Sequence, residues 1–269
     1  MSNVPMSGSA GPSGYTLAIA DRDEIPEVQR LRHDVLAAQY GTHLPTLAQG
    51  LDSDEFDEHS DHLIVRHTRS RAIVGTYRMM TPQCAELAGG RFGDRTFDLS
   101  PLRHLDADLV ETGRACVHPH HRQGAVISMI WSGIGRYLRR SGHHHLGGCV
   151  WVSMHDGGHA AAGIWAAVRE KYLAPPQYRV APRQRLLDDG AAAVGPTALP
   201  PLLQGYLRAG GWVCGEPTYD PEAKVAAFYV LLSLDHMNPR YRRRFLGESV
   251  RAADSTTTPG PREEPPERP

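Results

Sequence analysis

Glu111 and Arg114 are the residues whose types and spacing most directly suggest chemistry. They lie in an otherwise apolar stretch, where a carboxyl group has a raised pKa that suits it to accept a proton from an ammonium group. Strict alternation along a strand places them on opposite faces, unless a β-bulge intervenes, for which Gly113 is the expected position. A structural ion pair of Glu111 with Arg78 or Arg114 is an equally favoured interpretation.

A predicted helix start follows this strand and holds Arg122, Gln123 and Gly124. Free backbone N–H groups and the helix dipole attract phosphate at such a start, a glycine lets the phosphate approach, and an arginine adds a bidentate donor. The same residues fit an ordinary strand-to-helix connection with a solvated arginine. The local pattern leaves both interpretations open.

The segment from Thr112 to His155 contains no aspartate or glutamate, although it contains five arginines and seven histidines. Such a segment attracts an anionic ligand or an acidic protein partner. Arg136, Arg139 and Arg140 also complement the C-terminal end of a helix dipole, which explains their charges but not the missing acids. We therefore expect a binding role for the segment.

Negative charge gathers in the run LDSDEFDEHSD, which begins at Leu51 and includes Asp54 and Asp57. These carboxylates are suited to hold a cationic amine, although a solvated acidic loop is the more common structure for such a run. The spacing of a calcium-binding loop is absent from the run.

The histidines and cysteines predict no metal site. His118, His120 and His121 form one cluster and a run of three histidines begins at His143, but neither has HExxH spacing and no cysteine belongs to a CxxC pair. Cys116 lies in an apolar strand, where a cysteine is usually a small buried hydrophobic residue. Its use as a nucleophile with His118 is the alternative.

A mixed sheet is expected to position these residues. The periodicity predicts strands at 15–20, 62–68, 72–80, 108–117 and 146–153, and helices at 23–38, 121–140 and 159–172, with irregular connections at 41–61 and 81–93. The last third predicts a short helix at 201–210, strands at 212–220 and 228–234, and a basic ending at 238–247. This order indicates an α/β (α+β) fold.

Composition limits the classes of function. The formal charge of -1 over 269 residues argues against a nucleic-acid-binding protein. The sequence has neither a secretory signal pattern nor an apolar run of about 18 residues, so a cytoplasmic protein is expected. The Ser, Gly and Pro-rich residues 1–14 and the Pro-rich residues 248–269 are predicted to be disordered tails around one domain at 15–247.

Several blocks of sequence resemble one enzyme family. The order of four blocks resembles the acyl-carrier-protein-dependent branch of the GNAT acyltransferase superfamily, most of all its ornithine-lipid (hemolysin-like) N-acyltransferases. The blocks are RLRHDVLAAQYG, DSDEFDEHSDHLIV, IVGTYRMMTP and ETGRACV. The resemblance extends over residues 15–247. The related acyl-homoserine lactone synthases share an arginine in the first helix, a D-x-x-D pair, an arginine on the next strand and E-x-x-R. The matching residues here are Arg32, Asp54, Asp57, Arg78, Glu111 and Arg114.

The resemblance implies a GNAT-like fold: a mixed, mostly antiparallel sheet with helices on both faces, in which parallel strands at 111–117 and 146–153 splay apart. The implied cosubstrate is an acyl thioester of phosphopantetheine, on acyl carrier protein or CoA, and no permanently bound cofactor or metal is implied. The pantetheine arm would lie between the splayed strands. Its phosphate would lie at the helix start formed by Arg122, Gln123, Gly124, Ala125 and Val126.

The reaction implied by the resemblance is direct transfer of a long acyl chain to the α-amine of an amino acid such as ornithine. The implied catalytic residues are Glu111, as base, and Arg114, and backbone N–H groups of a splayed strand would stabilise the oxyanion. The implied substrate-binding residues are Arg32, Asp54, Asp57 and Arg78. The lipid product implies peripheral contact with a membrane.

The acetyl-CoA signature Gln/Arg-x-x-Gly-x-Gly/Ala is altered at both ends, where this sequence has His121 and Val126. This departure favours a carrier protein, whose acidic surface would meet the basic segment around Arg136 to Arg140. Three alternatives stay open: an acetyl-CoA-dependent N-acetyltransferase of small molecules, a noncatalytic module that binds acyl chains or carrier protein, and a lactone synthase that uses S-adenosylmethionine.

Overall fold

The structure is a computed structural model, and it describes residues 9–10, 14–41, 43–122, 124–186 and 197–246. Of the tails predicted at 1–14 and 248–269, only Ser9–Ala10, which pair with the next strand, and Gly14 lie within these residues. None of the described helices is both long enough and apolar enough to cross a membrane.

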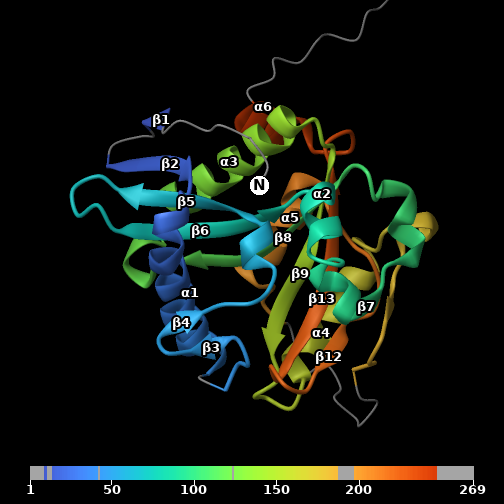
Figure 1. Cartoon of the computed structure of the whole chain (residues 1–269). Coiled ribbons are helices and arrows are strands. Elements are labelled where there is room, and N and C mark those ends of the chain that lie inside the picture. The colour runs from blue at the N-terminus through green and yellow to red at the C-terminus, as the bar shows by residue number, and fades with distance from the viewer. Residues whose placement is uncertain (1–8, 11–13, 42, 123, 187–196, 247–269) are drawn as a thin grey trace, which may run out of the picture.

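A nine-stranded sheet runs through the molecule in the order β1-β2-β5-β6-β8-β9-β13-β11, and β12 also pairs with β13 (Figure 1). The pairs are antiparallel except for β8 with β9, as expected. The strands of this sheet are β1 (Ser9–Ala10), β2 (Tyr15–Ile19), β5 (Asp61–His67), β6 (Ile73–Met80), β8 (Leu109–Val117), β9 (His145–Ser153), β11 (Trp212–Val213), β12 (Thr218–Asp220) and β13 (Val225–Ser233).

Two short antiparallel pairs lie outside this sheet, β3 (Leu47–Ala48) with β4 (Leu51–Asp52) and β7 (Phe97–Asp98) with β10 (Ala181–Pro182). The α-helices are α1 (Ile25–Tyr40), α2 (Pro82–Leu87), α3 (Ala125–Ser141), α4 (His159–Arg169), α5 (Pro201–Ala209) and α6 (Pro239–Leu246). The 3-10 helices are η1 (Arg22–Glu24), η2 (Asp57–His59), η3 (Phe92–Arg95), η4 (Ser100–Leu105), η5 (Pro119–His121) and η6 (Pro176–Tyr178).

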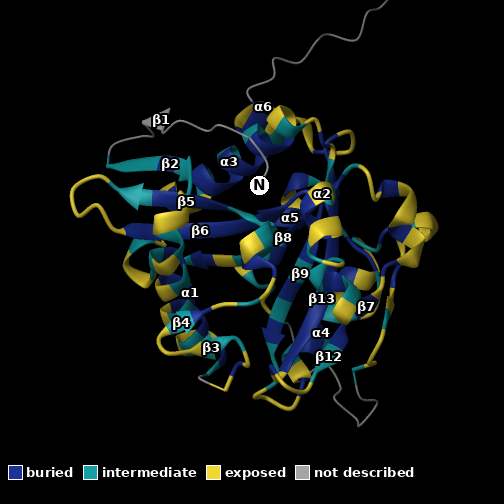
Figure 2. Ribbon diagram, in the orientation of Figure 1, coloured by how far each residue is buried: buried dark blue, intermediate teal, exposed yellow. Residues whose placement is uncertain are grey.

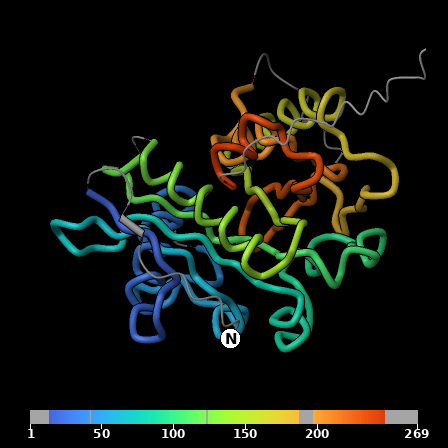
Figure 3. Tube along the Cα trace, turned by 90° about the horizontal axis from the view of Figure 1, so that it is seen from above, coloured from blue at the N-terminus to red at the C-terminus, as the bar shows by residue number. Residues whose placement is uncertain are grey.

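Alternation along the strands explains why helices cover both faces. On β5, Leu63 and Val65 pack into the core beneath α3, whereas Ile64 packs with α1 on the other face. The central strands are buried and the exposed residues gather on helices and loops (Figure 2). Seen from above, the N-terminal and C-terminal halves of the chain lie side by side (Figure 3), and β8 and β9 join them.

Several elements differ from the prediction. The strand expected at 212–220 is two short strands, β11 and β12, the strand expected at 228–234 begins at Val225, and the basic ending forms α6. Two further differences concern helices. The helix expected at 121–140 begins at Ala125, because Pro119–His121 form the 3-10 helix η5 first. The connection expected to be irregular contains α2, which begins with Pro82 in its first turn and is capped by the Thr81 hydroxyl, which accepts the N–H of Cys84 at 3.4 Å.

Candidate active site

The parallel strands β8 and β9 part from one another along their length. They pair from Leu109 with His145 as far as Thr112 with Gly148, and the described residues beyond that point make no further pair between them. A Cβ atom on Gly148 would lie 2.3 Å from the carbonyl oxygen of Thr112, so only glycine permits this last close approach. The predicted splay is therefore present, and it begins at Gly113.

A β-bulge on β8 coincides with the splay. Between its pairs with β6 at Gly113 and Cys116, β8 contains two residues, Arg114 and Ala115, where β6 has only Tyr77. Arg114 adopts a φ of 53°, in the left-handed region that a bulge residue can occupy. The bulge is formed one residue after the Gly113 position predicted for it, and it bends β8 away from β9.

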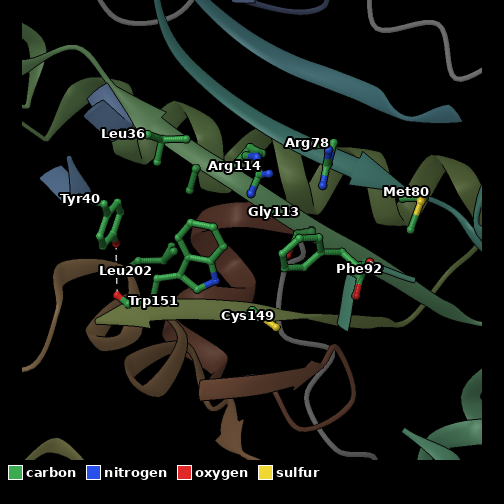
Figure 4. A pocket seen from close by; sticks show the side chains of 13 residues that line it. Leu36, Tyr40, Arg78, Met80, Phe92, Gly113, Arg114, Cys149, Trp151 and Leu202 are labelled. Atoms are coloured by element: carbon green, nitrogen blue, oxygen red, sulfur yellow. Dashed lines mark hydrogen bonds between the residues drawn. The ribbon is translucent and has the colours of Figure 1, made fainter. Parts of the chain in front are cut away.

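The bulge brings the two predicted catalytic residues to one place. Glu111 and Arg114 line the same small pocket of about 70 Å³, together with Phe92 and Trp151. Figure 4 shows the Arg114 guanidinium beside the rings of Trp151 and Phe92, with Arg78 next to Phe92. The Arg114 guanidinium carbon lies 5.4 Å from each ring centre, within reach of cation–π attraction. We call this space the Glu111 pocket.

A larger cleft of about 570 Å³ continues from the gap between the strands, and it shares Ala115 and Trp151 with the Glu111 pocket. Its walls are mostly apolar side chains, and its outer end is lined by Pro119 and Arg122, just before α3. We call it the strand cleft; its apolar wall includes Leu36, Val117, Ile130, Trp131, Val150 and Leu202.

Three buried hydroxyls mark the point at which the strands separate. The Tyr206 hydroxyl lies 2.6 Å from the Tyr77 hydroxyl and 3.0 Å from that of Thr112, which also donates to the carbonyl of Gly147 at 3.1 Å. Tyr77 and Thr112 are themselves 3.0 Å apart. The cluster joins β6, β8, β9 and α5 at the closed end of the splay.

Glu111 is buried, and backbone groups hold its carboxylate. The N–H of Gly93 donates to Oε1 at 2.8 Å, and the N–H of Phe92 donates to Oε2 at 2.7 Å. Burial raises the pKa of Glu111 from 4.5 to about 7, although these two hydrogen bonds and the charges of Arg78 and Arg91 oppose the rise. Glu111 can therefore take up and release a proton near neutral pH.

Glycine is required at position 93 for this arrangement. A Cβ atom there would lie 2.9 Å from Oε1 of Glu111 and 2.8 Å from Cε2 of Tyr229. The 3-10 helix η3 begins next to this carboxylate and presents its first free N–H groups to it. The alternative of an ion pair between Glu111 and Arg78 or Arg114 is not found, because within the described residues Glu111 has no cation within 4.0 Å.

The other predicted site residues form a buried network of ion pairs on the other side of Arg114. Arg32 is completely buried on α1, and it donates from Nε to Asp52 at 2.6 Å. It also donates to both carboxylate oxygens of Asp57, at 2.8 and 3.0 Å. This bidentate arrangement is the strongest form of an arginine–carboxylate pair.

Arg78 and Arg114 complete the network. Arg78 donates to Asp57 at 2.8 Å and to Asp54 in a short contact, and Arg114 donates to Asp54 at 2.9 Å. The Nε atom of Arg114 also lies 3.1 Å from Asp52. We call these three arginines and three aspartates the ion cluster; its formal charges cancel.

The arginines keep Asp54 and Asp57 in their ionised form. Burial raises the pKa of Asp54, but the charges of Arg78 and Arg114 outweigh it, so the pKa lies below its usual value. The pKa of Asp57 is lowered further, because Arg32 and Arg78 together outweigh its burial. This arrangement favours a role in positioning Arg78 and Arg114 over the predicted contact of Asp54 and Asp57 with a substrate amine.

The predicted phosphate-binding helix start lies at the outer end of the strand cleft. Gly124 caps α3 with a φ of 90°, Ala125 and Arg122 are exposed, and Arg122 donates from Nε to the carbonyl of Val117 at 3.2 Å. Val126 is buried in the core, so only its backbone N–H is available there. Gln123 lies outside the described residues.

The family described as "Acetyltransferase (GNAT) domain" matches residues 31–132. An L-ornithine N(alpha)-acyltransferase of Rhodobacter capsulatus is 31% identical over 253 residues, which cover 87% of this chain and 95% of that protein. The chain belongs to this GNAT acyltransferase family.

Two further proteins are similar to this acyltransferase. An L-ornithine N(alpha)-acyltransferase of Brucella abortus is 27% identical over 252 residues, which cover 86% of this chain and 88% of that protein. The solved structure of the acyl-homoserine lactone synthase LasI is 12% identical with a TM-score of 0.49, covering 87% of this chain and 95% of that one.

Several residues of the candidate site were not singled out from the sequence. Asp52 belongs to the acidic run and could have been chosen on that ground. It is the second carboxylate that binds Arg32, beside Asp57. Phe92 and Trp151 carried no signal, because their part in the site depends on how η3 folds over β8 and β9. The clustered histidines belong elsewhere: His145 pairs with Asp108 at 2.7 Å, and the described residues contain no group of His, Cys, Asp or Glu suited to a metal.

Proposed function

We propose that this acyltransferase moves an acyl group from a phosphopantetheine thioester to the α-amine of an amino acid, with Glu111 as the base. The observation that carries the proposal is the buried Glu111 carboxylate, whose pKa is about 7, at the point where β8 and β9 part. L-ornithine is the acceptor that the names of the relatives favour.

The proposed reaction has no covalent enzyme intermediate. An amino acid is mostly protonated at its α-amine near neutral pH, so the ammonium must first lose a proton, which Glu111 accepts directly or through a water molecule. The free amine then attacks the thioester carbonyl and forms the C–N bond. The tetrahedral oxyanion would be stabilised by backbone N–H groups on the unpaired edges of β8 and β9. The C–S bond breaks, and the thiolate leaves and takes up a proton.

The shape of the strand cleft supports a long donor. It is an apolar passage that begins beside the Glu111 pocket and ends at Arg122 and the start of α3. A pantetheine arm can lie along it with its phosphate near the free N–H groups of Gly124 and Ala125. The apolar walls suit a long acyl chain.

We propose acyl carrier protein as the donor, because the acid-free segment from Thr112 to His155 follows the cleft in sequence and α3 ends in Arg139 and Arg140. The basic helix α6 packs against α3, and Arg244 donates to the Ser128 hydroxyl at 3.1 Å. This surface complements the acidic surface of a carrier protein. The predicted cytoplasmic location follows from such a donor and belongs to this proposal.

The ion cluster supports the reaction indirectly. It holds the guanidinium groups of Arg78 and Arg114 at the edge of the Glu111 pocket without leaving a net charge there. Both arginines then present their remaining N–H groups to the pocket, where they can order a substrate carboxylate.

The test is acyl transfer by the purified full chain. The protein is incubated with L-ornithine and either long-chain acyl carrier protein, long-chain acyl-CoA or acetyl-CoA, and the products are identified by mass spectrometry. N-acylornithine from the long-chain carrier thioester is expected. Turnover of acetyl-CoA alone would indicate a small-molecule acetyltransferase, and carrier-protein binding without loss of thioester would indicate a noncatalytic module; either outcome contradicts the proposal.

Glu111→Gln tests the base in the same assay. We expect the rate to fall by about 10²–10⁴-fold, the usual contribution of a general base. Glu86→Gln is the matched control, because Glu86 is an exposed carboxylate on α2 that lies outside the Glu111 pocket. Full activity of Glu111→Gln would show that Glu111 is not the base that accepts the proton.

A further inference from the structure

A second pocket, of about 480 Å³, lies next to the Glu111 pocket. The two share a wall made by Phe92, Arg114 and Trp151. The rings of Phe92 and Trp151 are 6.2 Å apart between centres, and Figure 4 shows both rings beside Arg114. We call this second space the side pocket; a molecule bound there lies one side chain away from Glu111.

Cations line one part of the side pocket. Arg95, in the same 3-10 helix as Phe92 of the shared wall, lines the pocket but already pairs with Glu55. Arg183 is tied to this helix because its N–H donates to the carbonyl of Thr96 at 2.9 Å and its Nε donates to the carbonyl of Asp94 at 2.7 Å. Within the described chain, Arg183 has no carboxylate within 4.0 Å. Its terminal N–H groups therefore remain available to an anionic ligand.

Carboxylates line another part. The segment that begins with Arg183 continues to Gln184, whose carbonyl accepts the N–H of Tyr219 at 3.0 Å, so the segment lies between η3 and β12. Asp220 and Glu222 follow on β12 and the turn after it, and both line the pocket. The side pocket thus has arginines next to η3 and carboxylates at the end of β12 and in the turn after it.

The two carboxylates differ in how they are held. Oδ1 of Asp220 accepts the N–H groups of Glu222 at 3.0 Å and Ala223 at 2.9 Å, which fixes the turn. Glu222 is exposed, and no cation within the described residues lies within 4.0 Å of it. A cation that enters the pocket therefore meets a fixed carboxylate and a free one.

We infer that the side pocket binds the acceptor, an amino acid with a cationic side chain. Its α-carboxylate lies toward Arg183, its side-chain ammonium lies toward Asp220 and Glu222, and its α-amine points past Phe92 to Glu111. This inference rests on the proposed function. It replaces the acidic run at Asp54 and Asp57 as the place that recognises positive charge, because those carboxylates already bind arginines.

The pattern of charge explains a preference between acceptors. The α-carboxylate of any amino acid can pair with Arg183, whereas a side-chain ammonium also pairs with Asp220 and Glu222. Discrimination against an acceptor that lacks the ammonium then comes from the loss of its ion pair with these carboxylates. L-ornithine and L-norvaline have the same carbon skeleton and differ in the side-chain ammonium, so this pair isolates the effect.

The experiment compares the acylation kinetics of L-ornithine and L-norvaline with the purified full chain. Glu222→Gln is expected to raise KM for ornithine about tenfold, as for one charged hydrogen bond, and to leave KM for norvaline unchanged. Arg183→Gln is expected to raise KM for both acceptors. The controls are Glu216→Gln and Arg185→Gln, two exposed neighbours that do not line the pocket and should change neither.

The outcomes separate this inference from the proposed function. If the wild-type protein acylates ornithine and Glu222→Gln leaves KM unchanged, or the control variants shift KM equally, the side pocket is not the acceptor site although the function stands. If no amine is acylated, calorimetric titration with both amino acids tests the pocket directly. If the wild-type protein binds ornithine more tightly than norvaline and Glu222→Gln binds the two equally, the inference is supported. If the wild-type protein and Glu222→Gln each bind the two amino acids equally, the inference is overturned.

Discussion

The two sides of strand β8 hold buried carboxyl groups in opposite states. Asp54 and Asp57 lie in the ion cluster, where arginines hold their pKa values below the usual range. Glu111 is just as inaccessible, but its partners are two backbone N–H groups, and burial raises its pKa to about 7. Only Glu111 can therefore exchange a proton at neutral pH.

The contrast shows that the partner, rather than burial, decides what a buried acid can do. A formal positive charge in contact keeps an acid ionised, and backbone dipoles alone do not offset its desolvation. The two sides also depend on pH with opposite signs. The contribution of Glu111 to stability is present below pH 4.5 and is lost as the pH rises through about 7. The contribution of Asp54 and Asp57 to stability is present above about pH 3.9 and is lost as the pH falls below this value.

Asp57→Asn should give the largest effect, on stability. Asp57 accepts hydrogen bonds from both Arg32 and Arg78, and its loss leaves buried guanidinium charge uncompensated. We expect a loss of about 3–5 kcal/mol in the free energy of unfolding, measured by urea denaturation at neutral pH.

Asp34→Asn is the control for this variant, because the Asp34 side chain is 77% exposed and should change stability by less than about 0.5 kcal/mol. The difference between the wild type and Asp57→Asn should narrow as the pH falls below about 4, because the aspartates of the unfolded wild-type chain then take up protons while those of the folded chain stay ionised. A loss for Asp57→Asn no larger than that of the control would mean that the ion cluster does not hold this side of β8 together.

Gly93→Ala should have a smaller effect, on the Glu111 side of the comparison. The added methyl group would press on Glu111 and Tyr229 and displace the N–H donor, at a cost of about 1–3 kcal/mol in unfolding free energy. Gly113→Ala is the matched control, since its Cβ atom would approach only Arg78, at 3.8 Å. Equal stability of the two variants would show that η3 does not clamp the Glu111 carboxylate.

Tyr206→Phe should have the smallest effect. It removes one hydroxyl from the cluster at the closed end of the splay, while Tyr77 and Thr112 remain paired, so we expect a loss of about 1 kcal/mol. Tyr229→Phe is the comparison, because its buried hydroxyl has no hydrogen-bond partner among the described residues, and its removal should be neutral or stabilising. Both variants are measured by thermal unfolding. A larger loss of stability for Tyr229→Phe than for Tyr206→Phe would contradict the assignment of the stabilising hydrogen bonds to the Tyr206 hydroxyl.

Much of the fold could be predicted from periodicity. The strands β5, β6, β8 and β9 and the helices α1 and α3 lie close to the expected ranges, because each has a long apolar pattern of one period. Elements without such a pattern were missed. Helix α2 has six residues, and η3 forms one turn whose conformation depends on the neighbouring strands.

The site was predictable to the extent that short motifs mark it. The motifs name five of the six residues of the ion cluster: Arg32, Asp54, Asp57, Arg78 and Arg114. Which arginine binds which aspartate, and that Asp52 is the sixth member, can be seen only from the three-dimensional contacts. The state of Glu111 could not be predicted, because its donors lie in a segment 18 residues and more away in sequence.

The pH dependence of acyl transfer by the wild type and Glu111→Gln tests the central claim most directly. For the wild type, kcat/KM for the amine should rise with pH through an apparent pKa of about 7 as Glu111 loses its proton, and then level off. In Glu111→Gln this rise should be absent, and kcat/KM should be about 10²–10⁴-fold lower than the value at which the wild type levels off. The same rise near pH 7 in Glu111→Gln, at an undiminished rate, would contradict the assignment of Glu111 as the base.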